Sequence, residues 1–169
     1  RFNDVFAPNV TNRLKVIYLN DNAMGPRALE RIEPLLSSPG LEGIHLNNCG
    51  LSAETIPQLD TALKVEGAGL GVGRLTSLSL DKNMIGVEGA KQVGLLLPSC
   101  NRLEYFSYCG CRPLAEGTQF LTEGLKNMVE TATEDEHPLR QLKLWDCSIG
   151  SGEEEDDAIH DLVGMLSNT

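Results

Sequence analysis

Apolar residues recur five times along this chain at spacings of three, two and five, with Asn or Cys between the last two. The copies are Leu14-Ile17-Leu19-Asn22-Met24, Leu41-Ile44-Leu46-Cys49-Leu51, Leu75-Leu78-Leu80-Asn83-Ile85, the shorter Leu103-Phe106-Tyr108-Cys111, and Leu139-Leu142-Leu144-Cys147-Ile149. Two apolar residues at spacing two predict a short strand with alternate side chains facing a core. Regular recurrence of this pattern indicates stacked units that share one core.

The second half of each unit carries a helical pattern. Apolar residues stand ten and fourteen positions after the Asn or Cys: Ile32 and Leu36, Leu59 and Leu63, Val93 and Leu97, Leu121 and Leu125. Residues four apart share one helix face, so each unit is predicted to be a strand followed by an amphipathic helix. Small residues six positions after the Asn or Cys predict close helix contacts, at Ala28, Thr55, Gly89 and Gly117.

The form L-x-x-L-x-L-x-x-[NC]-x-L is that of leucine-rich repeats. The repeats begin near Leu14, Leu41, Leu75, Leu103 and Leu139, and their intervals of 27 to 36 residues favour the helical, ribonuclease-inhibitor-like subclass. We therefore predict an α/β fold, a single leucine-rich-repeat domain over residues 1–169 that belongs to a longer chain. It should be a right-handed βα solenoid of five repeats, with a parallel sheet on the concave face and helices on the convex face. The extra length is assigned to loops at residues 64–74 and 127–138.

The charge balance restricts the partners that such a surface would bind. Asp and Glu number 24 against 14 Lys and Arg, which gives a net charge of -10. Nucleic acid and anionic membranes are unfavourable partners for this charge, and a basic protein surface is a favourable one. An equally open interpretation is that the acidity only keeps the repeats in solution.

Cysteine usage indicates core packing and gives no sign of metal chemistry. Cys49, Cys111 and Cys147 occupy the Asn or Cys position of their repeats, where a small side chain turns inward, so we expect reduced core thiols. The spacing of cysteines and histidines does not fit a zinc site. We predict no metal, no cofactor and no self-contained enzyme active site.

Exposed strand positions and the turns after them form the candidate recognition surface. These residues are Tyr18, Asn20, Asp21, His45, Asn47, Asn48, Ser79, Asp81, Lys82, Ser107, Cys109, Lys143, Trp145 and Asp146. A large exposed ring often anchors a partner, which makes Trp145 a candidate contact. The alternative is that residues nearer the C-terminus cover it.

Two linked segments carry a family resemblance. Leu19-Asn20-Asp21-Asn22-Ala23-Met24-Gly25-Pro26 and Leu46-Asn47-Asn48-Cys49-Gly50-Leu51 resemble paired signatures of the Ran GTPase-activating protein family. Arg112-Pro113, followed by Glu116-Gly117 and Leu125, is similar to a later repeat of that family, and the acidic run 153–157 resembles the end of its repeat domain. The family usually carries an Arg where this chain has Asn9.

The resemblance implies a cytoplasmic, monomeric activator that makes Ran hydrolyse GTP and serves nucleocytoplasmic transport. Its partner would be a Ran-type GTPase in the GTP form. The family's catalytic Asn corresponds to Asn48, which would position the glutamine of the GTPase, with Asn47 beside it. An amide suits this role because it offers both a donor and an acceptor. The alternative for Asn48 is that it only caps a turn.

Two other functions remain open at this stage. A non-catalytic adaptor or inhibitor of the same repeat class would grip a basic protein through the exposed row and Trp145. A fragment of an innate-immune receptor is a third hypothesis. The acidic run 153–157 fits contact with a basic partner as well as it fits the first turn of a helix with Ser151 as its cap.

Overall fold

Five short strands form a single parallel sheet. The computed structural model describes residues 14–63, 74–131, 139–147, 160 and 163–164. The strands are β1 Val16–Tyr18, β2 Gly43–His45, β3 Ser77–Ser79, β4 Tyr105–Ser107 and β5 Gln141–Lys143, in the sheet order β1-β2-β3-β4-β5. Sheet order equals chain order, so each unit adds its strand beside that of the preceding unit.

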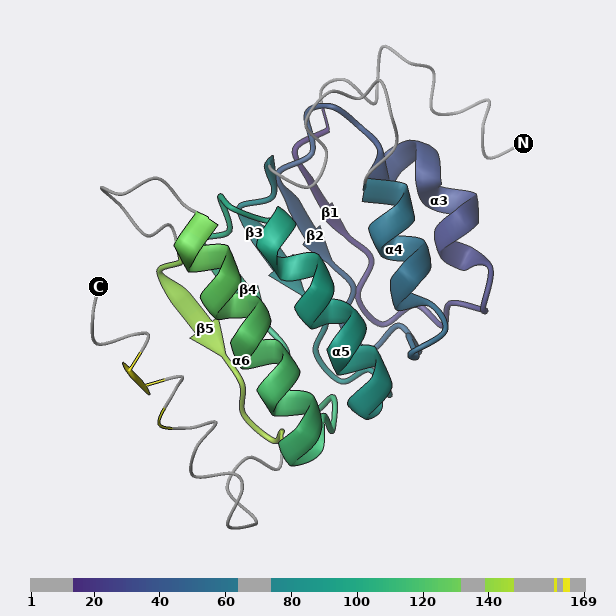
Figure 1. Ribbon diagram of the computed structural model, residues 1–169. Helices are drawn as coiled ribbons and strands as arrows, with labels where there is room; N and C mark the ends of the chain where they lie inside the picture. The colour runs from purple at the N-terminus through teal and green to yellow at the C-terminus, as the bar shows by residue number, and fades with distance from the viewer. Residues whose placement is uncertain (1–13, 64–73, 132–138, 148–159, 161–162, 165–169) are drawn as a thin grey trace.

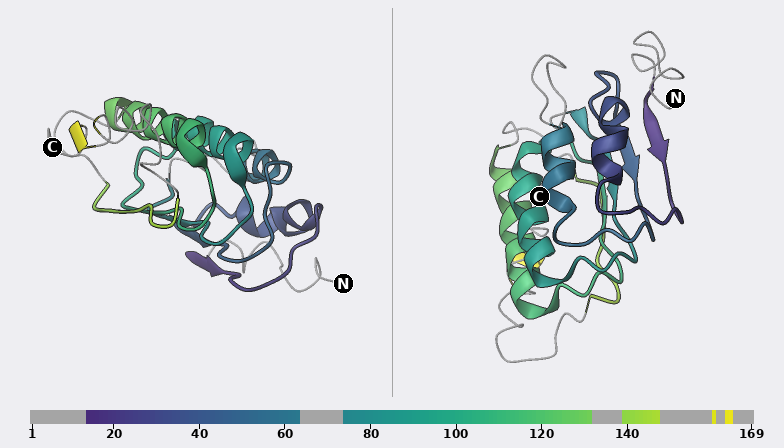
Figure 2. Two further views of the ribbon diagram at one scale, coloured as in Figure 1. Left: turned by 90° about the horizontal axis from the view of Figure 1, so that it is seen from below. Right: turned by 90° about the vertical axis from the view of Figure 1, so that its right-hand side faces the viewer.

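The helices of the described residues lie in a separate layer on one face of this sheet (Figures 1 and 2). They are α3 Ala28–Leu36, α4 Ile56–Leu63, α5 Gly86–Leu96 and α6 Leu114–Thr131, and the 3-10 turn η2 Leu97–Ser99 continues α5. Strands and helices alternate along the chain, as the strand-then-helix pattern predicts. None of these helices is both long and apolar enough to cross a bilayer.

The core lies between the two layers. The central residues of the strands pair in one register across the sheet, Ile17 with Ile44, then Leu78, Phe106 and Leu142. On the helices, the predicted inward positions are buried at Leu36, Leu59, Leu63, Val93, Leu97, Leu121 and Leu125, and Ile32 is partly buried. The apolar pattern therefore predicted the core-facing residues of both layers.

The predicted loop at residues 127–138 is wrong in its first part. Helix α6 continues for 18 residues to Thr131. Met128, which extends the apolar face three residues beyond Leu125, is fully buried and gives the extra turn a reason to remain helical. The rest of this segment, and the predicted loop from residue 64 to 73, lie outside the described residues.

Glycines allow α5 and α6 to touch backbone to backbone. A Cβ atom on Gly124 would lie 2.3 Å from the carbonyl oxygen of Gly94, and one on Gly94 would lie 2.4 Å from that of Phe120. The predicted close contacts are confirmed at Gly117, where a Cβ would lie 3.0 Å from the Cβ of Ala90, and at Gly89, where Ala53 would be 3.1 Å away. The Gly94–Gly124 contact is closer than either predicted one.

We expect Gly124→Ala to destabilise the fold, because the new methyl group would collide with backbone. Overpacking of this kind costs about 1–3 kcal/mol, and the helix propensity gained on replacing Gly by Ala offsets up to about 1 kcal/mol of it. Urea unfolding measures the difference. Gly25→Ala is the matched control, because no atom lies within 4 Å of its added Cβ. Equal stability of the two variants would contradict the close contact.

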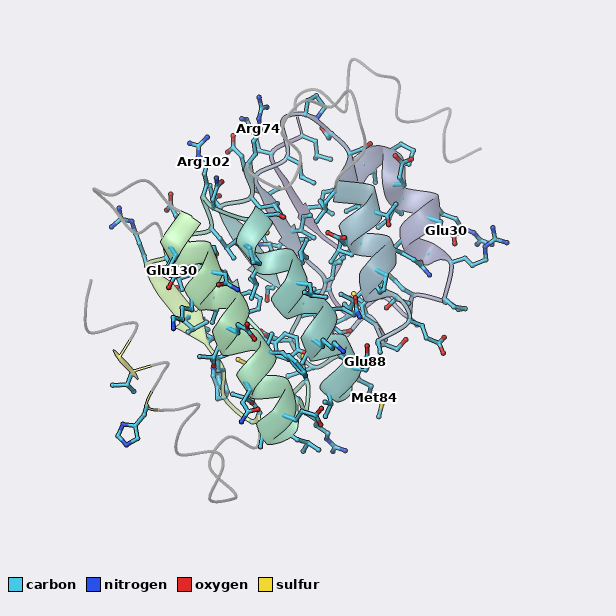
Figure 3. All side chains as sticks on the ribbon, in the orientation of Figure 1. Glu30, Arg74, Met84, Glu88, Arg102 and Glu130 are labelled. Carbon is cyan, nitrogen blue, oxygen red and sulfur yellow. The ribbon has the colours of Figure 1, made fainter. Side chains whose placement is uncertain are left out.

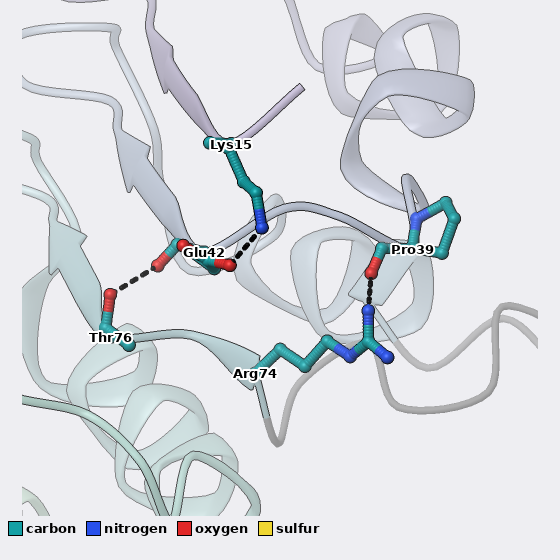
Figure 4. A network of polar contacts seen from close by, with 5 residues as sticks. All are labelled: Lys15, Pro39, Glu42, Arg74 and Thr76. Atoms are coloured by element: carbon teal, nitrogen blue, oxygen red, sulfur yellow. Dashed lines mark hydrogen bonds and ion pairs between the residues drawn. The ribbon is translucent and has the colours of Figure 1, made fainter. Parts of the chain in front are cut away.

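Side chains join the first three units at the edge where the strands begin (Figure 4). Lys15 forms an ion pair with Glu42, and Arg74 donates a hydrogen bond to the carbonyl of Pro39. Thr76 donates its hydroxyl proton to the carbonyl of Glu42 at 3.1 Å. Figure 3 places Arg74 and Arg102 at this edge and Met84 and Glu88 at the opposite one, where the turns after the strands lie.

Candidate functional site

One side chain of the third unit connects it to the second through three hydrogen bonds. Asn83 is only 1% exposed. Its Oδ1 accepts the backbone N–H of Cys49 at 2.9 Å and of Leu51 at 3.1 Å. Its Nδ2 donates to the carbonyls of Leu46 at 2.8 Å and of Leu80 at 2.6 Å. We call the five equivalent positions, Asn22, Cys49, Asn83, Cys111 and Cys147, the ladder positions.

Cysteine replaces asparagine at three ladder positions. Cys49, Cys111 and Cys147 each donate the S–H proton to a carbonyl of the preceding unit, at 3.0, 3.1 and 3.0 Å. All three are buried and free, which confirms the prediction of reduced core thiols. Burial raises the pKa of Cys49, that of Cys111 to about 12 and that of Cys147 to about 11. These thiols stay protonated near neutral pH, so they are weak nucleophiles.

Three predicted contact residues also hold successive units together. Asn20, Asn47 and Asp81 occupy the same position in the first three units, which we call the acceptor row. The Oδ1 of each accepts a hydrogen bond from the backbone N–H of the equivalent residue in the next unit. Asn20 accepts from Asn47 at 2.9 Å, Asn47 accepts from Asp81 at 2.9 Å, and Asp81 accepts from Cys109 at 2.8 Å. Their side-chain oxygens are thus engaged in stacking.

The predicted exposure of Ser79, Ser107 and Cys109 is wrong. Both serines are 0% exposed and Cys109 is 8% exposed. The hydroxyl of Ser79 donates to the Oδ1 of Asn47 at 2.6 Å, and that of Ser107 donates to the Oδ1 of Asp81 at 2.7 Å. These two serine side chains are short and hydrogen-bond to the acceptor row, so they are buried.

The residue after the acceptor row has a left-handed backbone in every unit. We call these residues, Asp21, Asn48, Lys82, Gly110 and Asp146, the turn row, and their φ angles are 60°, 52°, 56°, 67° and 57°. In the first four units the N–H of this residue donates to the acceptor-row carbonyl of the next unit, at 2.7–3.0 Å. Stacking thus holds four of the five turns, and the fifth adopts the same conformation. The four side chains of this row are exposed, as predicted.

Asn48 and Asp21 form a side-chain pair between neighbouring turns. The Nδ2 of Asn48 donates to the Oδ1 of Asp21 at 2.9 Å. An ionised carboxylate only accepts hydrogen bonds, so this contact selects the amide orientation with nitrogen toward Asp21 and oxygen away from it. Among the described residues, no hydrogen bond reaches the Oδ1 of Asn48. That oxygen can accept a hydrogen bond from a partner.

Ring side chains form a second row across the strands, exposed at Tyr18 and partly buried at His45 and Tyr105. Tyr18, which is 68% exposed, stacks on His45 with the ring centroids 4.5 Å apart and the planes at 15°. The centroid of Tyr105 lies 6.1 Å from that of His45, and the Nζ of Lys143 lies 5.2 Å from the Tyr105 centroid. His45 also shares a hydrogen bond with Ser77 at 3.1 Å. This ring row spans the sheet from β1 to β5.

Tyr105 is a surface residue that the sequence analysis missed. It precedes the core residue Phe106, and strand alternation places it on the same face as Ser107. The predicted recognition surface includes only positions after the core residue of each strand. The alternation of side chains in the strand was the signal that could have found Tyr105.

The last described unit presents the only tryptophan of the chain. Trp145 follows β5, is 70% exposed and lies next to the exposed Asp146. The predicted exposure of Trp145 is therefore confirmed for the described residues. Asn9, the acidic run 153–157 and Ser151 lie outside these residues.

The residues that the structure describes contain no group of three or more His, Cys, Asp or Glu side chains able to hold a metal ion. The two rows present hydrogen-bonding groups, aromatic rings and charged side chains.

Comparison with known proteins does not add a family assignment. No protein-family model matches the chain, and a search of the curated proteins finds no significant match.

His45 provides a pH test of the ring row. Burial lowers its pKa below the ordinary value of 6.5, while the negative charge of Asp81 acts in the opposite direction. We expect an NMR titration to show a His45 pKa below 6.5, and a still lower value in Asp81→Asn. Asparagine should preserve the stacking, because Asn20 and Asn47 fill the equivalent position.

The same shift fixes the sign of the stability change. The unfolded chain binds a proton at His45 near pH 6.5, whereas the folded chain binds it only at lower pH. The contribution of neutral His45 to the stability of the fold is therefore complete above pH 6.5. It is lost as the pH falls toward the pKa of His45 in the folded chain. A His45 pKa at or above 6.5, or a rise in Asp81→Asn, would contradict the arrangement.

Proposed function

We propose that this chain is a leucine-rich-repeat solenoid that activates the GTPase Ran in trans. The repeat pattern and the register of the parallel sheet support the fold. The single observation that carries the activity is Asn48, the residue that corresponds to the family's catalytic Asn. It is exposed, fixed in a left-handed turn with φ 52°, and its amide is oriented by Asp21.

The proposed mechanism is positioning. Hydrolysis of GTP by such enzymes depends on orienting the attacking water, a task performed by a glutamine of the GTPase. The Oδ1 of Asn48 would accept a hydrogen bond from the side-chain N–H of that glutamine and so hold its amide in one orientation. The chain carries Asn9 where the family has Arg, so the proposed activation works through the machinery of the GTPase itself.

The proposed docking surface joins the turn row to the ring row. Lys82 and Asp146 project from the same edge as Asn48, while Tyr18 and Lys143 lie on the adjoining sheet face. The activator would engage Ran in the GTP form, as a monomer in the cytoplasm, within nucleocytoplasmic transport.

We expect Asn48→Ala to lower the single-turnover rate of GTP hydrolysis by Ran by roughly 100-fold, the loss typical of removing one group that orients or stabilises a transition state. Binding of GTP-loaded Ran should change far less. Asn101→Ala is the matched control, because Asn101 is exposed beside Arg102 at the other edge of the sheet. No acceleration by the wild-type chain, or full acceleration by Asn48→Ala, would refute the proposed activity.

A second function, a non-catalytic adaptor or inhibitor, is favoured by a different observation. Trp145 exposes 70% of its surface on a chain whose net charge is -10. Such a residue can anchor a protein partner, and the acidity would favour a basic one.

Replacing Trp145 separates the two functions. If the chain is a non-catalytic binder, it should bind GTP-loaded Ran without accelerating hydrolysis, and salt should weaken the binding. Trp145→Ala should then reduce the affinity by about 30-fold, the effect of a hot-spot residue worth about 2 kcal/mol. Leu95→Ala is the control, since Leu95 is 66% exposed and lies on helix α5, in the other layer of the fold. Unchanged affinity in Trp145→Ala would exclude the anchor role.

A further inference from the structure

We propose that Asp21 is a positioning residue for Asn48: its carboxylate holds the amide so that Oδ1 points to the partner. This inference rests on the proposed function of Asn48, and it adds a second residue to the same site. The two side chains come from successive turns, 27 residues apart in sequence, and meet at 2.9 Å.

The backbone of both turns is fixed before the side chains meet. The N–H of Asp21 donates to the carbonyl of Asn47 at 2.8 Å, and that of Asn48 donates to the carbonyl of Asp81 at 2.7 Å. Both residues have left-handed φ angles, 60° and 52°. The freedom left to Asn48 is therefore rotation of its own side chain.

The hydrogen bond to Asp21 restricts rotation of the Asn48 side chain and selects one of the two orientations of its amide. The two ends of a carboxamide have almost the same shape, so a bare Asn48 could present either oxygen or nitrogen to a partner. An ionised carboxylate accepts hydrogen bonds and repels the amide oxygen, so the Nδ2 of Asn48 turns toward Asp21. Donation to a charged acceptor also polarises the amide, which makes its oxygen a better acceptor.

Because Asp21 and Asn48 are exposed, a variant can change the orientation of the Asn48 amide without unfolding the chain. Both side chains lie at the surface, where hydrogen bonds and charges contribute little to the stability of the fold. Removing the Asp21 carboxylate should therefore leave the chain folded while releasing the Asn48 amide. A loss of activity in such a variant would report on the amide.

The first test is single-turnover hydrolysis by GTP-loaded Ran with Asp21 variants. Asp21→Ala should reduce the maximal rate by roughly 10-fold to 100-fold, as expected for a misplaced catalytic group, and change the half-saturating concentration of the activator by less than about twofold. Asp21→Asn should recover most of the rate, because its amide oxygen can still accept from Asn48. Glu123→Ala should have no effect on the maximal rate. It is the matched control, because it removes an exposed carboxylate from helix α6, outside the proposed docking surface.

The second test needs no GTPase. In the wild-type chain, the side-chain NH₂ protons of Asn48 should give an NMR signal shifted by the Asp21 contact. Asp21→Ala should abolish this shift, and Asp21→Asn should retain part of it. Loss of the shifted Asn48 side-chain signal, with the other backbone amide signals unchanged, supports the positioning role. An Asn48 side-chain signal that is the same in the wild type and in Asp21→Ala overturns it.

The outcomes distinguish the two proposals. A wild-type chain that does not accelerate Ran overturns the proposed function. If the wild type is active and Asn48→Ala is impaired, but Asp21→Ala keeps the full rate, the positioning role alone is overturned. A lowered rate in Asp21→Ala with no recovery in Asp21→Asn also counts against it, because the proposed role needs only an acceptor.

Discussion

The structure depends on hydrogen bonds that side chains of one unit make to the backbone of its neighbour. The strands are only three residues long, so their ladders leave the turns with unpaired N–H and C=O groups. Burying such groups without a partner costs about 1–3 kcal/mol each. Asn83 satisfies four of them in the middle of the sheet. Cys49 has no side-chain oxygen to accept the equivalent N–H, that of Met24. This N–H donates to the backbone carbonyl of Cys49 at 2.9 Å.

These bonds also create the exposed surface. Because each turn is held by its neighbour, the turn row adopts one left-handed conformation and its side chains leave the stack at the same point. The acceptor row lies one residue earlier and is directed inward, where its oxygens bond to the next unit. Neighbouring residues of one turn thus divide between stacking and exposure to solvent. Asn47 belongs to the first group and Asn48 to the second, although their side chains are chemically identical.

Sequence periodicity predicted the alternation of strands and helices because it reflects what is buried. The apolar spacing located the strands, the helix faces and the core thiols. It did not predict the burial of Ser79 and Ser107, since exposure in a sheet also depends on the size and hydrogen bonds of lateral neighbours. The contact between Gly94 and Gly124, and the pair of Asp21 with Asn48, join different units. Such contacts follow from how units of unequal length stack, which a single repeat does not specify.

The division between stacking side chains and exposed ones decides how mutations at this surface can be interpreted. A substitution at Asn47 or Asp81 removes an acceptor for a backbone N–H, so a loss of partner binding would follow from a distorted stack as readily as from a lost contact. A substitution at Asn48 leaves its backbone hydrogen bond to Asp81 in place. Asparagine also tolerates the left-handed region better than most residues, and a replacement there carries a modest conformational cost that a second turn-row variant can measure. The turn row is therefore the part of the molecule where function can be changed without changing the fold.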